Sequence, residues 1–574
     1  MPAPFSVIRF LLRTTGLLVL TGYVLSCSKD NSSEGLAQVE RPGEPMNIVL
    51  ISIDSVRRDH LSVYGHRPQY APELKVSPNL EALAADGVVF DDAWTTSSWT
   101  LPTHMSLMTG LTGRRHGVET DRFKLDPLRT TLAENLQNAG WNTAGYFSGP
   151  YLDPKFGFGR GFDDYQSGMI TAEDFTLMLE EERLRRVQQG KEPMTPEFIH
   201  RMRDRMSHYD ITSPRINQLG KAFLAQQKAD EPFFLFLHYF DAHYDYDPGR
   251  MEEGLNIRFD PGFDNRGEKG VLGLNWYFDP KVLDLKAPFT RRISERDLSH
   301  VIALYDAEIN WVDRHIGDII DTLKAQGQWE NTILMVVADH GDEFFEHRGI
   351  GHRSTLFAEQ CRIPMILRVP GETPAGRRVP AISRIYDVAP TLLDFAGAPA
   401  LQEAEGASLR ETIQGRGEPR FALQRIFSGG YRTSRGGINV RDGWRSSRYT
   451  VVREFGYDQE NTTDEAIAVK AKRRKNQGDA YLVFDRLQDP KELKPLSPSD
   501  PRYAEAVNAF CRDFRASEIE ARKLKISPLE ERLGPIYSAE EQTMLNEMGY
   551  ADSVEEKAES LDRPLAPFPE PCLQ

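Results

Sequence analysis

The chain has 574 residues, of which 85 are acidic and 70 basic, giving a formal net charge of -15. This length predicts one large domain with at least one further unit. Four cysteines are too few for a disulfide-stapled scaffold, and 40% hydrophobic with 27% charged residues exclude both a disordered chain and a multi-span membrane protein. The acidic surplus argues against a nucleic-acid partner, because such proteins neutralise phosphates with basic side chains.

Residues 1–26 have the features of a secretory signal peptide. Two arginines precede an apolar stretch at residues 17–25, which is too short to span a bilayer. The following Cys27 resembles the bacterial lipoprotein box, in which the Cys is lipidated and becomes the new N-terminus. We therefore expect an exported lipoprotein, periplasmic or at the cell surface, that contacts the membrane through a lipid on Cys27. Ser28 favours the outer membrane, and an ordinary cleaved signal is the alternative.

The segment after the signal is predicted to be a tether. Residues 27–46 are rich in Ser, Asp, Glu, Gly and Pro, a composition typical of flexible linkers. The remaining cysteines form no CxxC pair, which argues against a zinc-thiolate site. One bridge between Cys511 and Cys572 could form, and Cys361 is interpreted as a small buried residue.

The next part of the chain predicts an α/β fold. A helical pattern at 131–140 lies among continuous apolar runs at 47–53, 233–240, 333–338 and 364–369. Such runs are typical of a mainly parallel central sheet flanked by helices, because strands buried on both faces do not alternate in polarity. We assign this large domain to residues 47–415.

A second unit follows. Residues 416–515 contain alternating strand patterns with aromatic residues, which predict a smaller antiparallel sheet subdomain. Residues 516–574 form a charged tail whose Pro-rich end we expect to be poorly ordered.

Polar residues directly follow three of the apolar runs. Asp54 follows the first, Asp241 and His243 follow the run at 233–240, and Asp339 with His340 follows the run at 333–338. Ligands of such sheets bind beyond the carboxyl ends of the strands. Asp54 alone could cap a helix, but two strand ends that supply Asp and Asp-His are a pattern suited to a divalent metal ion.

Thr100 lies close to the predicted start of a helix. Pro102 fits the first helical turn, where its fixed φ matches and its missing N–H is not needed. The helix N-terminus stabilises an anion, such as a Thr alkoxide or a bound oxyanion. A hydroxyl that is bound to a metal there could act as a nucleophile. The alternative is that Thr100 is an N-cap.

Five segments in order carry a resemblance to a known family. They are IDSVRRDHLSVYG (53–65), WTLPTHMSLMTGLTGRRHGV (99–118), PFFLFLHYFDAHYDYDP (232–248), VVADHGDEFFEHRGIGH (336–352) and RIYDVAPTLLDFAGAP (384–399). On these motifs, the chain from Asn47 to about Ala398 resembles the sulfatase branch of the alkaline phosphatase superfamily. This resemblance implies one α/β fold and hydrolysis of sulfate or phosphate esters by a metal-bound nucleophile.

The resemblance implies a ligand set and a nucleophile. Asp54, Asp339 and His340 would bind the metal, and Thr100 would be both nucleophile and ligand. The chain departs from the family at Thr100, because sulfatases carry a Cys that is converted to formylglycine. The Arg of the family's C-x-P-x-R motif is replaced by His104, which we include among the catalytic candidates.

Other positions resemble relatives of the sulfatases. Tyr146 and Ser148 look like the Tyr and Thr that bind ester oxygens in phosphonate monoester hydrolases. His352 stands where sulfatases have a Lys, and a His at that spacing binds a second zinc in phosphoethanolamine transferases. His352 could therefore contact the oxyanion or hold a second metal ion.

Three further histidines lie within or after the apolar runs. His243 resembles the substrate histidine of the family and is the candidate general acid for the leaving oxygen, with Asp241 as a substrate-binding neighbour. His238 is interpreted as a core or supporting residue, and His347 as a supporting residue.

These features predict a metal-dependent hydrolase of sulfate or phosphate-type esters. The substrate would be an anionic ester of a glycan, a lipid or a small molecule, and the metal would be Ca, Mn or Zn. The Thr nucleophile favours phosphodiester or phosphonate monoester cleavage, whereas the overall likeness favours a sulfatase. The alternatives are an envelope phosphoryl-group transferase and a catalytically silent glycan-binding lipoprotein. The sequence does not indicate an oligomeric state.

Overall fold

The computed structural model describes residues 45–170, 172–195, 210–244, 246–263, 294–347, 349–353, 355–428, 437–458 and 480–534. The predicted signal peptide, nearly all of the predicted tether and Cys572 lie outside these ranges. Among the described residues, no helix combines the length and the apolar character that a membrane span needs.

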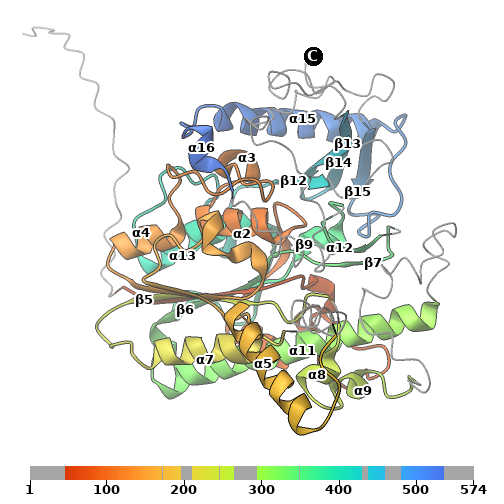
Figure 1. The fold of residues 1–574 in the computed structure, drawn as a ribbon. Helices are drawn as coiled ribbons and strands as arrows, with labels where there is room; N and C mark the ends of the chain where they lie inside the picture. The colour runs from red at the N-terminus through yellow and green to blue at the C-terminus, as the bar shows by residue number, and fades with distance from the viewer. Residues whose placement is uncertain are drawn as a thin grey trace, which may run out of the picture. The chain divides into compact units, whose positions relative to one another are not determined.

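A mainly parallel sheet forms the centre of the described structure (Figure 1). Eight strands follow the order β11-β2-β10-β6-β1-β5-β3-β4, and β9 pairs with β2. Their bounds are β1 (Asn47–Ile53), β2 (Val88–Trp94), β3 (Asn142–Phe147), β4 (Asp164–Ser167), β5 (Phe233–Tyr239), β6 (Thr332–Ala338), β9 (Arg362–Ile363), β10 (Met365–Arg368) and β11 (Arg377–Arg384). Of these strands, β9 and β10 run antiparallel to their neighbours. The prediction of a mainly parallel sheet is confirmed.

Helices cover both faces of this sheet, as Figure 1 shows. One face carries α1 (Pro78–Asp86), α7 (Ser213–Leu224) and α11 (Glu295–Ala325), and the other carries α2 (Thr100–Thr109), α4 (Leu132–Asn138) and α13 (Val388–Ala396). The central strands β1, β5 and β6 are therefore buried along their whole length, which explains their continuous apolar sequences.

The remaining helices and strands of the large domain are short, apart from α5. They are α3 (Gly113–His116), α5 (Ala172–Gln188), α8 (Pro248–Met251), α9 (Leu255–Phe259), β7 (Glu343–Phe344), β8 (Ile350–Gly351), α12 (Ala358–Cys361) and α14 (Arg410–Ile413). Cys361 is fully buried and unpaired, as predicted from the sequence.

A second, antiparallel sheet has the order β12-β13-β14-β15. Its strands are β12 (Ala422–Ser428), β13 (Gly437–Arg445), β14 (Tyr449–Asp458) and β15 (Ala480–Asp485). The long helix α15 (Pro501–Ala521) packs on this sheet and buries Phe510 and Phe514 against Trp444 and Val451. The predicted small antiparallel subdomain is confirmed.

The folded part continues past residue 516, where the sequence predicts a charged tail to begin. Helix α15 crosses this position, and α16 (Leu529–Arg532) follows. Glu518 forms an ion pair with Arg114 of the large domain, and Ser527 bonds Asp126 through its hydroxyl and its N–H. Residues up to 534 therefore pack as part of the protein. Cys511 in α15 is disulfide-bonded.

Glu492 connects the small sheet to the loop that follows β6. Its carboxylate accepts the hydroxyl of Thr450 at 2.6 Å and the N–H of Ala358 at 2.9 Å. Its carbonyl accepts Nε2–H of His347 at 2.8 Å, and Nδ1 of His347 lies 2.6 Å from Glu359 Oε1. Both ring nitrogens of His347 thus face acceptors, an arrangement that favours the imidazolium.

Because this imidazolium loses its charge at alkaline pH, the free energy of unfolding should fall as pH rises. Burial alone would lower the pKa of His347, but the bond and charge of Glu359 raise it to about 9. A raised folded-state pKa contributes stability that is complete below the ordinary pKa of about 6.5 and is lost as pH rises through the folded value.

We predict that His347→Gln lowers the free energy of unfolding at about pH 7 more than at about pH 10, because the wild-type ion pair is lost as pH rises. Urea unfolding of both proteins across this range measures the difference. His315→Gln is the control, because burial lowers the pKa of His315 and leaves it neutral throughout the range. A difference for His347→Gln that stays constant with pH would contradict the prediction.

Candidate active site

Two buried carboxylates lie side by side at the carboxyl end of the central sheet. Parallel pairing of β1 with β6 brings the residues that follow them, Asp54 and Asp339, to neighbouring positions. Neither side chain is exposed. Asp339 Oδ1 accepts the backbone N–H groups of Ser55 at 3.0 Å and His340 at 2.7 Å, whereas Asp339 Oδ2 has no hydrogen-bond partner.

Thr100 brings a hydroxyl to this pair of carboxylates. It is the first residue of α2, and Pro102 lies in the first turn. The hydroxyl oxygen of Thr100 is 3.4 Å from Asp54 Oδ2 and 3.3 Å from His340 Nε2. The N-cap residue is Trp99, and it makes no side-chain capping bond. The hydroxyl of Thr100 therefore faces the carboxylates instead of capping the helix.

His340 completes the group with a ring nitrogen that carries a lone pair. Its Nδ1 lies 3.3 Å from the carbonyl of Gly341, to which it can only donate. Nε2 therefore has no proton in the neutral ring, and it lies 3.4 Å from Asp339 Oδ2 and 3.9 Å from Asp54 Oδ1.

The spacing of these atoms fits a divalent cation. Separations of 3.3 and 3.4 Å exceed the usual ~2.7–3.2 Å of hydrogen bonds. Two ligands that each lie ~2.1 Å from one ion in tetrahedral geometry are roughly 3.4 Å apart. The unpartnered Oδ2 of Asp339 agrees, because a buried carboxylate oxygen without a donor is costly. The four predicted ligands, Asp54, Thr100, Asp339 and His340, could hold such an ion.

The pKa values of these groups also fit the binding of a divalent cation. Burial alone would raise the pKa of Asp54, but the nearby imidazoles of His238, His243 and His340 hold it well below its usual range. Burial and the charge of Asp54 raise the pKa of Asp339 well above its usual value. Burial lowers the pKa of His340 to about 4, so its imidazole is neutral at physiological pH and can donate a lone pair to a cation.

His243 and His352, which were also predicted to be catalytic, lie beside this group. The ring of His352 is 4.3 Å from that of His340 and 5.0 Å from that of His243. Nδ1 of His352 donates to Asp342 at 2.6 Å, and its Nε2 has no partner. Nδ1 of His243 lies 2.6 Å from the carbonyl of Tyr244. Burial lowers the pKa of both histidines to about 4, so both are neutral at physiological pH.

The turn after Asp54 is held by helix α11. Ser55 has a φ of 57°, in the left-handed region that non-glycine residues rarely adopt. The hydroxyl of Tyr305 donates to the carbonyl of Ser55 at 2.7 Å and accepts the N–H of Arg57 at 2.8 Å. The hydroxyl of Ser55 in turn donates to Asp54 Oδ1 at 2.7 Å. These contacts fix the carboxylate before any ligand binds.

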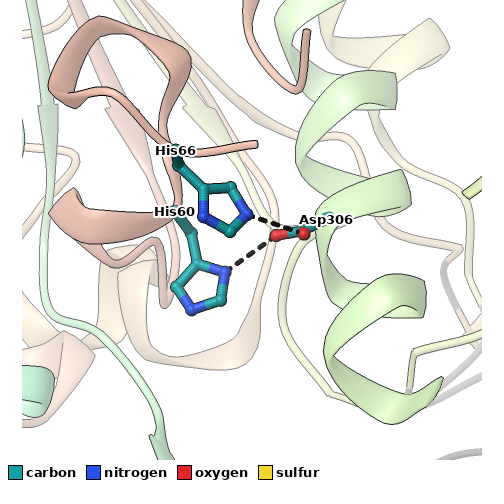
Figure 2. A group of neighbouring side chains, drawn as sticks. All are labelled: His60, His66 and Asp306. Carbon is teal, nitrogen blue, oxygen red and sulfur yellow. Dashed lines mark hydrogen bonds and ion pairs between the residues drawn. The ribbon is translucent and has the colours of Figure 1, made fainter. Parts of the chain in front are cut away.

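A second histidine cluster lies further along the same turn (Figure 2). His60 Nδ1 and His66 Nε2 lie 2.7 and 2.8 Å from the two oxygens of Asp306 on α11. These residue types could hold a metal. The separations are those of hydrogen bonds, however, and each carboxylate oxygen already has its imidazole partner. We interpret this cluster as a structural link between the turn and α11.

Asp241, predicted to bind substrate, has a different role. One of its carboxylate oxygens accepts the N–H of Thr212 at 2.7 Å and its hydroxyl at 2.6 Å. The other accepts the N–H of Ser213 at 2.9 Å and the indole N–H of Trp311 at 3.0 Å. In the structure Asp241 therefore holds the N-terminus of α7 against α11, and its contact with substrate stays a prediction.

Tyr146 and Ser148, also predicted to bind substrate, already have acceptors within the protein. The hydroxyl of Tyr146 donates to Asp164 at 2.7 Å, and that of Ser148 to the carbonyl of His238 at 3.0 Å. Both residues are buried. The structure therefore places these two hydroxyls in supporting contacts.

His104, predicted to be catalytic, lies behind Thr100. Its Nδ1 donates to the carbonyl of Thr100 at 2.9 Å, and its Nε2 lies 2.8 Å from the hydroxyl of Ser52. Both nitrogens are thus used, and burial lowers the pKa of His104 to about 3. His104 is a neutral positioning residue for Thr100.

The sequence did not single out two residues of this region, and a third, His238, was predicted to be a core or supporting residue. Asp342 orients His352, and its other oxygen accepts the hydroxyl of Tyr246. Arg353 brings a positive charge over the ring of Trp99, with its guanidinium carbon 4.0 Å from the ring centre. His238, the assigned core residue, is indeed buried, but it lies beside Asp54. Its signal was a polar residue near the end of an apolar run, the rule that identified Asp54.

Comparison with known proteins identifies the family. The sulfatase family model matches residues 46–398, more than half of the chain. A model of the N-sulphoglucosamine sulphohydrolase C-terminal region matches residues 346–461. The chain therefore belongs to the sulfatase family and is an ester hydrolase of that family, which confirms the resemblance read from the motifs.

Individual relatives cover nearly the whole chain. An arylsulfatase of Clostridium perfringens is 24% identical over 83% of this chain and 95% of its own length. A choline-sulfatase of Rhizobium meliloti is 26% identical over 87% and 91%.

Solved structures share the fold. A protein solved with its substrate D-glucosamine-2-N,6-O-disulfate matches with a TM-score of 0.59 and 17% identity, over 84% of this chain and 99% of its own. A phosphonate monoester hydrolase of Agrobacterium radiobacter matches with a TM-score of 0.57 and 20% identity, over 83% and 96%.

Proposed function

We propose that this chain is a metal-dependent hydrolase of sulfate or phosphate-type esters that uses Thr100 as its nucleophile. The observation that carries this proposal is the position of the Thr100 hydroxyl, which lies within 3.4 Å of Asp54 and of His340 without capping its own helix. When bound, a divalent cation would supply positive charge that lowers the pKa of the hydroxyl and offsets the charge of the ester.

The residues of the site supply the other parts of a double displacement. The oxygen of Thr100 forms a bond to sulfur or phosphorus as the bond to the leaving oxygen breaks, and water then releases the group from Thr100. His104 fixes the carbonyl of Thr100 and so the start of α2. The free N–H groups at that helix start favour the negative charge of the transferred group.

His243 remains our candidate for the proton donor to the leaving oxygen. Because burial lowers its pKa to about 4, it is neutral before the substrate binds. The negative charge of a bound ester favours the protonated form of His243. The imidazole would therefore take up a proton from solvent when the anionic substrate binds.

Phosphate-type esters suit the Thr nucleophile better than sulfate esters do. In formylglycine sulfatases the sulfated intermediate can collapse by elimination, whereas a sulfated Thr has to be attacked at sulfur. This favours a phosphodiester or a phosphonate monoester. The family membership and the relatives named arylsulfatase and choline-sulfatase favour a sulfate ester, and the sugar disulfate bound by one structural neighbour makes a glycan a candidate substrate.

Turnover of a substrate panel tests the nucleophile and the class of ester. We predict that Thr100→Ala lowers kcat about 10³-fold or more on the ester that the wild type cleaves, because the attacking oxygen is removed. The panel contains an aryl sulfate, a phosphate monoester, a phosphodiester and a phosphonate monoester. Thr109→Ala, at the other end of the same helix, is the control. Full activity of Thr100→Ala would rule out this nucleophile.

For the metal we propose zinc or manganese over calcium, because an imidazole ligand suits these ions better. His352 is the residue that decides whether a second ion binds, since its neutral Nε2 has no hydrogen-bond partner among the residues that the structure describes.

Metal removal should destabilise the protein. We predict that chelation abolishes activity and lowers Tm, and that returning the ion at about 100 times its Kd stabilises the fold by about 2.7 kcal/mol. Differential scanning calorimetry measures the change, and Asp339→Asn should respond much less. An unchanged Tm of the wild type would contradict metal dependence. Elemental analysis of the wild type and His352→Gln shows whether His352 holds a second ion.

We also propose that Cys27 carries a lipid that attaches the mature protein to a membrane at the cell envelope. The support is the sequence pattern at residues 1–27. Mass spectrometry of the N-terminal peptide should find a lipidated Cys27, and Cys27→Ala should release the protein from the membrane fraction. An unmodified N-terminus would exclude the anchor.

A further inference from the structure

We propose that His238 is an additional ligand of the metal ion, donated by β5. This inference rests on the metal dependence of the proposed function. It concerns a residue that the sequence predicted to be only a core or supporting residue.

The position of His238 follows from strand register. β5 pairs in parallel with β1, and His238 lies opposite Ser52, two residues before Asp54. The side chain is completely buried. Its Nε2 is 3.6 Å from Asp54 Oδ2, so it approaches the same carboxylate oxygen as Thr100 does.

The tautomer of His238 is fixed by Ser148. Nδ1 lies 2.7 Å from the carbonyl of Ser148, which can only accept, so Nδ1 carries the proton. The hydroxyl of Ser148 returns a bond to the carbonyl of His238 at 3.0 Å, which holds the two strand ends together. In the neutral ring, Nε2 then has no proton, and its lone pair faces the carboxylates. The carbonyl that orients the ring is the type of partner that metal-bound histidines have on their other nitrogen.

The environment of Nε2 contains no donor from the described residues. This nitrogen is buried and, within that part of the chain, has no hydrogen-bond partner, like Oδ2 of Asp339. A lone pair next to a buried carboxylate is unfavourable unless positive charge lies between them. The 3.6 Å separation from Asp54 is too long for a hydrogen bond and close to the roughly 3.4 Å between two ligands of one small ion.

His104 shows by contrast why His238 is singled out. Both histidines could be grouped with Asp339 around a cation. His104 uses both nitrogens, one on the carbonyl of Thr100 and one on the hydroxyl of Ser52. His238 uses only Nδ1. With His238 included, the donors comprise two carboxylates, two imidazoles and one hydroxyl, a set that strengthens the preference for zinc or manganese.

The rival explanation is a metal-independent ion pair. In that case His238 would carry protons on both nitrogens and balance the charge of Asp54, and its removal would leave metal affinity nearly unchanged.

Two variants of His238 separate these explanations. His238→Asn places an amide N–H where Nδ1 was, so it keeps a donor for the carbonyl of Ser148 but removes the ligand atom. His238→Gln reaches the position of Nε2 with an amide that can present an oxygen, but it gives up the bond to Ser148. His66→Asn, in the cluster of His60, His66 and Asp306, removes a partly buried histidine–carboxylate hydrogen bond away from the site.

The readouts are zinc affinity, measured by competition with a chromophoric chelator, and zinc X-ray absorption, which counts imidazole ligands. We expect His238→Asn to weaken zinc binding more than about 100-fold, beyond the 10–100-fold that loss of an outer partner typically costs. His238→Gln should retain more affinity than His238→Asn, and His66→Asn should bind as the wild type does. Absorption spectra should show two imidazoles in the wild type and one in His238→Asn.

The opposite results overturn the proposal. Zinc binding by His238→Asn within about tenfold of the wild type, or one imidazole in the wild-type spectrum, would exclude His238 as a ligand. His352→Gln, which should keep two imidazoles in its spectrum, separates His238 from the neighbouring His352 even if the His238 variants fail to fold. A wild type that binds no divalent ion would refute the metal of the proposed function and this inference together. Normal metal binding by His238→Asn beside an inactive Thr100→Ala would refute this inference alone.

Discussion

The register of β1 against β6 is the constraint on which the site depends. Because the two strands run in parallel and end together, Asp54 and Asp339 emerge as neighbours in a region without solvent. Two carboxylates so close cannot both be charged without a compensating positive charge. The opposite pKa shifts of the two groups express this conflict. The two carboxylates therefore favour a cation between them, and the other residues of the site provide further ligands for it.

Contacts from outside the sheet prevent the two carboxylates from moving apart. Tyr305 of α11 holds the strained turn at Ser55 from one side, and Asp306 of the same helix holds His60 and His66 further along. On the other side, His104 ties the carbonyl of Thr100 to Ser52 of β1. The carboxylates and the hydroxyl are thus held by two helices on opposite faces of the sheet, so a small ion or an ester would meet a site that is already formed.

The sequence predicted the parts of this structure that follow from periodicity, and it was weaker where a side chain could turn either way. Asp54, Asp339 and Asp241 all follow apolar runs, yet Asp241 turns away to bind the N-terminus of α7. Nothing in the sequence distinguishes these directions, because they depend on where α7 and α11 pack. His238 lies within its apolar run, which predicts a core or supporting residue, although strand register brings it level with the site. Phe510 and Phe514 lie on one face of α15 among charged residues, so their helix crosses the predicted start of the tail.

The three departures from the sulfatase pattern together lower the positive charge of the site. A formylglycine precursor, an Arg and a Lys are replaced by Thr100, His104 and His352, and burial keeps both histidines neutral. Two fixed positive charges have therefore left the site of a protein whose net charge is already -15. Arg353 restores one of them nearby, stacked on Trp99. The remaining attraction for an anionic ester has to come from the helix start at Thr100 and from a cation held by the carboxylates. Neutral imidazoles leave the charge of that cation undiminished, whereas a Lys or an Arg in their place would repel it.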